Sequence, residues 1–347
     1  MKNTLLFTLL VLALFFGALL GGATASEGTV SEGTVSEGTA SVAADPLPPE
    51  EEEEPNLPAS QAISEFHEYF SGGVEALSRR IDAFFGSTRI YEEASGTYLQ
   101  MRGNVIYGRS GEIGFDGKVR ARLDLPNLEE RVHLVIESEE EETVSETRVA
   151  AGSTPAQAVD EKKLTTSLQY VVKSTRRWDV RLQPGIRVNM DPRPFLRLRF
   201  RLMQPLSETW LSRTTLTPGW FEDRGWEGRA FFDFERATGG GSLFRSSTQG
   251  VWLFDEPKDV QLTQSLLYAH PIGSRVQMAY QFGVTAEVDP KFQDTFYFLN
   301  VRYRKNIHQG WMFLELQPQV LFDREDDFKP DASFSLTLEI LIGGRYL

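Results

Sequence analysis

Near the carboxyl end of the chain, residues Ser333–Gly343 have the sequence SFSLTLEILIG. Apolar side chains occupy every second position from Phe334 to Ile342, and the positions between them hold mainly Ser, Thr and Glu. Successive side chains of a β-strand point to opposite faces, so this period of two predicts a strand with one apolar and one polar face.

The same alternation recurs from about residue 97 to the end of the chain. Five further segments show it clearly: Lys118–Leu125, Asp179–Met190, Phe195–Leu202, Arg275–Ala286 and Thr295–Arg304. Two architectures produce such strands. A soluble sandwich or barrel turns the apolar faces inward, whereas a transmembrane barrel turns them outward to lipid and keeps the polar faces in its lumen.

Three features favour the transmembrane barrel. Many segments have about ten residues or more, the length that a tilted strand needs to cross a bilayer. Their polar faces carry rows of Arg with Glu and Asp. Short and long connections also alternate along the chain. We expect short turns at Ser174–Arg177, Gln204–Ser207 and Asn306–Gly310, and longer loops at Glu137–Thr165, Thr217–Gly228 and Asp323–Asp331.

The fold class is therefore all-β: a transmembrane, antiparallel, up-and-down β-barrel with an N-terminal amphipathic helix. We count about 14 strands, and 12 is the rival number, because such barrels have an even number of strands. Short periplasmic turns and longer outer loops are usual in this class, which would place both chain ends on the periplasmic side.

Four segments make up the predicted organisation. Residues 1–25 resemble a signal peptide, with Lys2, an apolar stretch and the small-residue site Ala23-Thr24-Ala25. Residues 26–57 hold Ser-Glu-Gly-Thr repeats and the acidic run Glu50–Glu54, a composition typical of disorder. Residues 58–90 form the amphipathic helical segment, and residues 91–347 form the barrel.

The helical segment has its apolar residues three and four positions apart over Ser60–Gly86: Ile63, Phe66, Phe70, Val74, Leu77, Ile81 and Phe84. Gly72-Gly73 is expected to break or kink it. The apolar stripe could lie on a membrane surface, plug a lumen or pack on a sheet. Its polar face is of mixed charge, which disfavours binding to a lipid surface.

Some positions do not follow the barrel pattern. Pro184 and Pro318 lie inside strand segments, where we expect them to mark bulges, because proline removes a ladder hydrogen bond. Gln264 falls on an otherwise apolar face. Thr209–Leu216 alternates poorly, and the sequence does not assign its two faces.

The end of the chain resembles the last strand of Gram-negative outer-membrane β-barrels, which alternates apolar residues and ends with an aromatic one. Leu336, Leu338, Ile340, Ile342 and Tyr346 share one parity here, although Leu347 follows the aromatic residue. Segments such as Ile81–Gly86, Leu123–Pro126 and Trp311–Leu316 also resemble those of a family of exported proteins of Gram-negative bacteria. The resemblance implies outer-membrane localisation and assembly by the barrel-assembly machinery, and it carries over no functional residue.

Composition excludes several kinds of function. The 347 residues include no Cys, which excludes a disulfide scaffold, a thiolate metal site and a catalytic Cys. The formal charge of −13 argues against nucleic-acid binding. We find no nucleophile–base constellation, so we expect no enzyme, and we expect no metal and no cofactor. His133, on the lumen side of a strand, is expected to form a hydrogen bond rather than act as a base.

The polar strand faces define the candidate site. We expect them to line the lumen with these residues: Arg181, Arg187, Arg197, Arg199, Arg201, Arg229, Asp233, Glu235, Arg302, Arg304, Glu315 and Glu339. Buried charges must pair or meet water. The residues therefore form either a structural ion-pair network that fills a narrow barrel or the lining of a water-filled pore that favours anions. Phe296, Phe298 and Phe313 share the inward parity and indicate a constricted interior.

Three functions remain open. The first is an outer-membrane channel or transporter for small solutes with an Arg/Glu-lined lumen. The second is a non-conducting barrel that serves as a scaffold or anchor for a periplasmic partner of the acidic tail or helix. The third is a soluble exported β-sheet protein that binds a ligand, in which the face of Tyr297, Leu299, Val301 and Tyr303 would be a core. Membrane lipid is the expected environment for the first two.

Overall fold

Residues 57–347 form one compact unit. Within it, this computed structural model describes residues 73–87, 96–109, 111–125, 131–139, 163–188, 192–223, 225–253, 260–288 and 292–343. The expected signal peptide and acidic tail, and most of the expected loop at Glu137–Thr165, lie outside the described residues.

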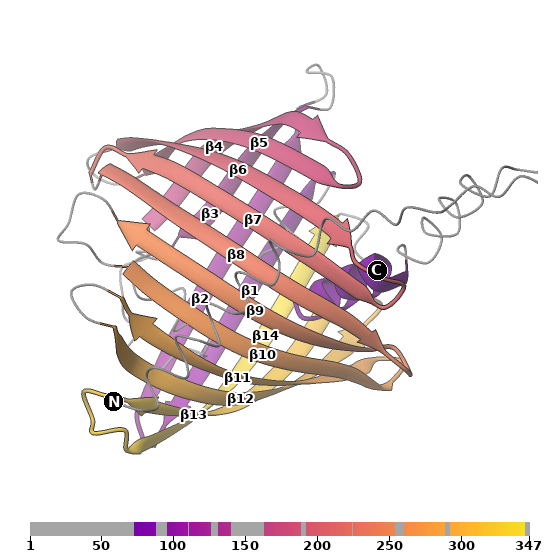
Figure 1. The fold of residues 1–347 in the computed structure, drawn as a ribbon, viewed down its shortest axis with the longest axis vertical. Helices are drawn as coiled ribbons and strands as arrows, with labels where there is room; N and C mark the ends of the chain where they lie inside the picture. The colour runs from indigo at the N-terminus through magenta and orange to yellow at the C-terminus, as the bar shows by residue number, and fades with distance from the viewer. Residues whose placement is uncertain are drawn as a thin grey trace, which may run out of the picture. The chain divides into compact units, whose positions relative to one another are not determined.

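The described part of the alternating region folds almost entirely into strands (Figure 1). The strands are β1 (Tyr98–Gly108), β2 (Ile113–Asp124), β3 (Val132–Glu139), β4 (Lys163–Ser174), β5 (Trp178–Val188), β6 (Arg193–Pro205), β7 (Trp210–Phe221), β8 (Gly225–Thr238), β9 (Ser242–Leu253), β10 (Val260–Gly273), β11 (Val276–Glu287), β12 (Gln293–His308), β13 (Met312–Asp323) and β14 (Pro330–Gly343).

Each strand pairs with its neighbours in sequence, and β1 pairs antiparallel with β14, so the sheet closes on itself. This is an up-and-down antiparallel barrel of 14 strands, which confirms the predicted fold class and excludes the 12-strand count. The even number of strands returns the end of β14 to the mouth where β1 begins. We call this end of the barrel, which also carries the β4–β5, β6–β7 and β8–β9 turns, the proximal mouth.

The two faces of the sheet have opposite character. Leu299 of β12 points outward and is 48% exposed, whereas its neighbour Asn300 points inward and is 1% exposed. The same division holds on β14, where Leu336 and Leu338 face outward and Glu339 is fully buried. The face of Leu299 is therefore not the core that the soluble alternative requires.

The expectation that Pro184 and Pro318 mark bulges is wrong. Pro184 keeps its register opposite Leu196, and Pro318 keeps its register opposite Phe334. Each proline instead leaves a gap in the pairing with its other neighbour, β4 or β12, while the register on both sides of the gap is unchanged. The proline lacks an N–H donor, so one of its two strand ladders is interrupted locally without a shift in register. The register shifts lie at Val171/Lys173, Pro271/Gly273, Thr285/Ala286 and Asn306/His308.

The prediction of a long loop at Thr217–Gly228 is also wrong. β7 extends to Phe221 and β8 begins at Gly225, with Trp220 paired to Trp226 across a tight turn. The glycines and the proline of this segment are typical of loops, but here they lie inside paired strands.

Residues 73–84 form a helix, which we call the lumen helix. Ser87 N–H donates to Asp82 O and Gly86 N–H donates to Ala83 O, and Gly86 has a φ of 61°. These two hydrogen bonds and the left-handed glycine form a Schellman motif, which ends the helix. Within the described part of the chain, no helix is both long enough and apolar enough to cross a membrane.

Candidate functional site

The lumen helix lies inside the barrel at the proximal mouth. Its apolar side packs in a buried cluster that contains Ile81, Phe84 and Phe85 of the helix end with Tyr98, Leu243, Ala269, Ala279, Phe313 and Leu341 of the barrel wall. The rings of Phe84 and Phe313 meet edge to face, with centroids 5.6 Å apart. Of the three placements that the helical stripe allowed, the structure thus shows the helix inside the lumen.

The polar side of the helix is also buried, against charged strand residues. Asp82 accepts two hydrogen bonds from Arg245 of β9, at 2.8 and 2.9 Å, and its carboxylate lies 3.6 Å from Arg213 of β7. Ser78, one turn earlier, accepts a hydrogen bond from Arg245 at 3.1 Å. Arg245 also donates to Glu235 of β8 at 2.8 Å. Two guanidinium groups and two carboxylates therefore neutralise one another where the helix meets the wall.

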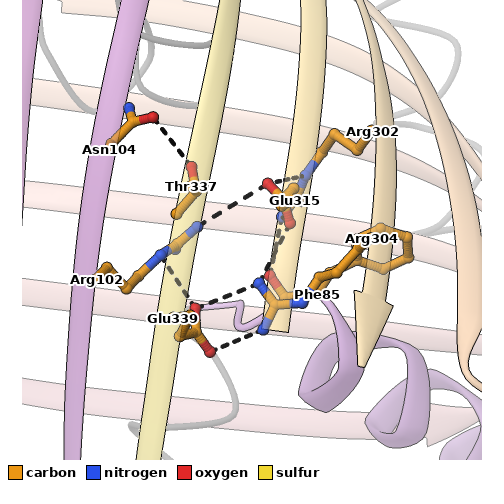
Figure 2. A network of polar contacts seen from close by, with 8 residues as sticks. All are labelled: Phe85, Arg102, Asn104, Arg302, Arg304, Glu315, Thr337 and Glu339. Carbon is orange, nitrogen blue, oxygen red and sulfur yellow. Dashed lines mark hydrogen bonds and ion pairs between the residues drawn. The ribbon is translucent and has the colours of Figure 1, made fainter. Parts of the chain in front are cut away.

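A second charged cluster supports the end of the helix, and we call it the Glu315/Glu339 network. It consists of Arg102, Arg302, Arg304, Glu315 and Glu339 (Figure 2). Arg304 and Glu339 are both fully buried, and Arg304 donates to Glu339 at 2.8 Å and to Glu315 at 3.3 Å. Arg302 donates to Glu315 at 2.9 Å, and Arg102 lies 3.1 Å from Glu339.

Three guanidinium groups face only two carboxylates in this network, and the helix end provides a further acceptor. Arg302 donates to the carbonyl of Phe85 at 2.9 Å, and its guanidinium lies 4.8 Å from the centre of the Phe85 ring (Figure 2). The last carbonyls of a helix carry partial negative charge and have no partner within the helix, so a cation here is favourable. The network thus links four strands of the wall, β1, β12, β13 and β14, to the end of the lumen helix.

Arginines also concentrate on the inner faces of β5 and β6. Arg181 donates to Asp179 at 2.8 Å, and Arg187 donates to Asp223 at 2.8 Å. Arg197 lies 3.9 Å from Glu137 of β3 and stacks on the rings of Phe195 and Phe221. Arg199 and Arg201 are buried on the same face of β6. On β8, Arg229 donates to Glu227 at 3.1 Å.

The residues that we expected to line the lumen all lie on the inner face of the wall, but in separate groups. Arg302, Arg304, Glu315 and Glu339 belong to one network. Asp233 and Glu235 lie on β8, where Glu235 reaches the Arg245–Asp82 pair and Asp233 accepts a hydrogen bond from Ser247 at 2.6 Å. The remaining residues line β5, β6 and the far part of β8. His133 is buried with Nδ1 2.7 Å from Asp124 Oδ1, so it forms a hydrogen bond in the lumen.

Sequence reasoning missed Asp82, Arg213, Arg245 and Arg102. Asp82 belongs to the helix, and no sequence pattern connects it to a particular strand. Arg213 lies on the strand whose faces were not assigned. Arg245 was missed because the inner face of β9 mixes apolar and polar residues, so alternation does not identify it: Leu243, Arg245, Ser247, Gln249 and Val251. Arg102 could have been found, because it alternates with outward Met101 and Val105. In the described ranges, no group of His, Asp and Glu side chains is arranged to hold a metal ion.

These features define the class of architecture: a closed β-barrel with an apolar outer face and a charged interior, as in transmembrane barrels. No family model and no curated protein matches the chain. Similar solved structures include the NanC porin, which is 9% identical and covers 70% of this chain and 98% of its own at a TM-score of 0.38. OprD of Pseudomonas aeruginosa is 10% identical over 72% of this chain and 95% of its own, with a TM-score of 0.41. OccK3 (OpdO) of the same organism is 9% identical over 73% and 98%, with a TM-score of 0.42.

Proposed function

We propose that this protein is an outer-membrane channel for small polar solutes whose proximal mouth is closed by its own lumen helix. The observation that carries the proposal is the manner in which the helix is held. Its buried apolar side packs against the inner wall, and Asp82 with Arg245 and Arg213, and the Phe85 carbonyl with Arg302, add ion pairs and hydrogen bonds. Ion pairs of this kind can break and re-form without disturbing the strand ladders, so the helix can act as a gate.

The outer and inner faces of the barrel support a membrane location for this channel. Large apolar side chains are exposed over most of the outside, including Phe115, Ile186, Phe282 and Ile342. An extended apolar surface of this kind is costly in water and is matched by lipid. The Arg and Glu side chains inside provide the polar lining that a water-filled path requires.

Single-channel recording in planar bilayers tests the proposal. We expect the full-length protein to be closed most of the time, with brief openings, and we expect Asp82→Asn to increase the open probability at least several-fold. The matched control is Arg80→Gln on the exposed side of the same helix, which should leave the open probability unchanged. Folding of each variant is checked by the shift in gel migration between unheated and boiled samples.

A non-conducting scaffold is the second candidate, and the aromatic and ion-paired inner face of the wall favours it. Phe296 and Phe298 are buried on the inner face of β12, away from the helix, and the charged side chains of the lumen form many mutual ion pairs. If folded Asp82→Asn protein never conducts, the channel proposal is wrong and the scaffold is favoured.

A further inference from the structure

One part of the outer surface of the barrel is partly polar. Ser212 and Thr214 of β7, Ser246 and Thr248 of β9, and Gln264 of β10 lie on the outer face, because Arg213, Arg245 and Ser265 are buried on the inner face; Ser212 itself is only 9% exposed. We call these five outward residues the polar patch. On the far side of the barrel, the outward positions of β2 are Ile113, Phe115, Gly117, Val119, Ala121 and Leu123.

The strand register places the patch residues in two rows, and in each row an outward Phe of β8 lies between the β7 and β9 residues. Thr214 lies opposite Phe232, Phe232 opposite Thr248, and Thr248 opposite Gln264, so these residues form one row across β7 to β10. Ser212, Phe234 and Ser246 form the next row in the same way. Gln264 joins the two rows, because it accepts a hydrogen bond from Thr248 and donates one to Ser246 at 3.0 Å.

Small residues adjoin the patch on the side away from the proximal mouth. Gly250 of β9 faces Ala230 of β8, and no atom would lie within 4 Å of a Cβ added at Gly250. The surface is therefore flat and open here, whereas bulky side chains such as Leu266 and Phe282 project beside it. Another protein surface could approach the backbone closely at this point.

Lipid chains cannot satisfy hydrogen-bonding groups, and Gln264 has more donors and acceptors than its two neighbours use. Contacts between transmembrane helices are enriched in small residues and in Ser, Thr and Gln side chains, whose hydrogen bonds join the partners, and the same lack of competing water applies to the lipid-facing surface of a barrel. The patch lies along the middle of β9 rather than at either mouth: Ser246 and Thr248 are flanked by the rest of Ser242–Leu253. Its composition and position are those of a protein contact rather than a lipid contact.

We propose that the polar patch on β7 to β10 is the surface through which two or more copies of this chain associate in the membrane. All copies insert with the same orientation, so the patch of one copy meets that of another at the same depth. The hydroxyls and the amide are both donors and acceptors, which makes the patch complementary to itself, as the contact of a closed symmetric oligomer requires. This inference rests on the membrane location of the barrel and is independent of conduction.

The absence of Cys from the chain permits a direct test. Thr248→Cys is compared with Val119→Cys, which is outward and 45% exposed on β2, seven strands from β9 in either direction around the barrel. Native outer membranes are treated with a short bis-maleimide. We expect cross-linked oligomers from the Thr248→Cys protein and only monomers from the Val119→Cys protein. Equal cross-linking of both variants, or none in either, would overturn the proposal.

A second measurement does not depend on cross-linking geometry. The mass of the purified protein in mild detergent is determined by light scattering, for the unaltered chain and for the Thr248→Val, Gln264→Leu double variant. We expect an oligomer that becomes a monomer in the double variant, while the heat-dependent gel shift persists. A monomeric unaltered chain, or a double variant that remains oligomeric, would contradict the proposal. Conductance is measured separately, so failure here leaves the channel proposal to its own test.

Discussion

The carboxylate of Asp82, on the lumen helix, accepts two hydrogen bonds from the guanidinium of Arg245, which lies 163 residues later on β9. Both side chains are almost completely buried. The contact is therefore a buried, two-pronged ion pair between a helix and the wall that surrounds it. Such a pair contributes more to the geometry of the contact than to its net stability, because desolvation of both charges offsets much of their attraction. It fixes the position and orientation of the helix in the lumen.

The Glu315/Glu339 network should be sensitive to the loss of one carboxylate. We expect Glu339→Gln to lower the free energy of unfolding by about 3–5 kcal/mol, because Arg304, which is fully buried, would keep only Glu315 as a charged partner. Urea unfolding in phospholipid vesicles, followed by tryptophan fluorescence, measures the change. Glu208→Gln, at an exposed position between β6 and β7, is the control and should change stability by no more than about 0.5 kcal/mol. Equal effects of the two variants would show that the network does not stabilise the barrel.

The end of the lumen helix should be sensitive to a single methyl group. A Cβ at Gly86 would lie 2.6 Å from Glu339 Oε2, in a backbone conformation with φ of 61°. We expect Gly86→Ala to displace the helix end and to expose the helix to trypsin, which cleaves after Arg79 and Arg80. The rate of limited proteolysis of the folded protein in detergent measures this exposure.

Gly86→Ala would introduce both a clash with Glu339 and backbone strain at a positive φ. Gly240→Ala separates these two causes. Gly240, in the turn between β8 and β9, also has a positive φ, 73°, but no atom would lie within 4 Å of its Cβ. This variant has the same kind of backbone strain without the clash, so proteolysis of the helix should stay at the unaltered rate. Faster cleavage in both variants would mean that general destabilisation, not contact with Glu339, controls the helix.

Phe298 fills a space in the wall that exists only because Gly283 has no side chain. A Cβ at Gly283 would lie 2.4 Å from Phe298 Cζ and 3.1 Å from the backbone oxygen of Gln264, so the ring would have to move. We expect Gly283→Ala to lower the free energy of unfolding by about 1–3 kcal/mol through overpacking. Gly103→Ala on β1, where a Cβ would have no close neighbour, should not destabilise the barrel in the same urea assay. A neutral Gly283→Ala variant would show that this part of the lumen is loosely packed.

Alternation along the chain predicted the strands and a count of about 14, with 12 as the rival number that the closed sheet excludes. It also placed Arg197, Arg304 and Glu339 on the inner face, because a residue's parity determines its side of the sheet once one face is apolar. The same reasoning failed for Thr217–Gly228, where the residues Pro218, Gly219, Gly225 and Gly228 suggested a loop. In the structure, Pro218 pairs with Gly228 inside the β7–β8 ladder.

Two departures from the pattern, Gln264 and Thr209–Leu216, were separate irregularities in the sequence. The register brings Thr214 of β7 and Gln264 of β10 into one row on the outer face, so the two departures belong to one surface. Periodicity within a strand cannot reveal this, because it contains no information about which residues of distant strands are level. The Asp82–Arg245 pair was missed for the same reason.

If the apolar outer face contacts lipid, the loss of stability caused by a charged side chain on that face should depend on how deep in the membrane it lies. Leu336 lies near the middle of β14, and Ile342 lies on the same outward face near the proximal mouth; they are 38% and 53% exposed, respectively. In a lipid-embedded barrel, Leu336→Lys should lower the free energy of unfolding by about 2–4 kcal/mol, whereas Ile342→Lys should cost about 0–1 kcal/mol, because its ammonium can reach the interface. Urea unfolding in phospholipid vesicles compares the two variants.

Leu336 and Ile342 differ mainly in their depth along the barrel wall. Both substitutions replace an outward aliphatic side chain with the same Lys on the same strand, so changes in strand propensity and in the unfolded chain are similar for the two. A soluble barrel would present both positions to water, and neither substitution would then cost more than about 0.5 kcal/mol. Equal costs at the two depths would show that the outer belt does not lie in hydrocarbon, and the channel and the association through the polar patch would both lose their physical basis.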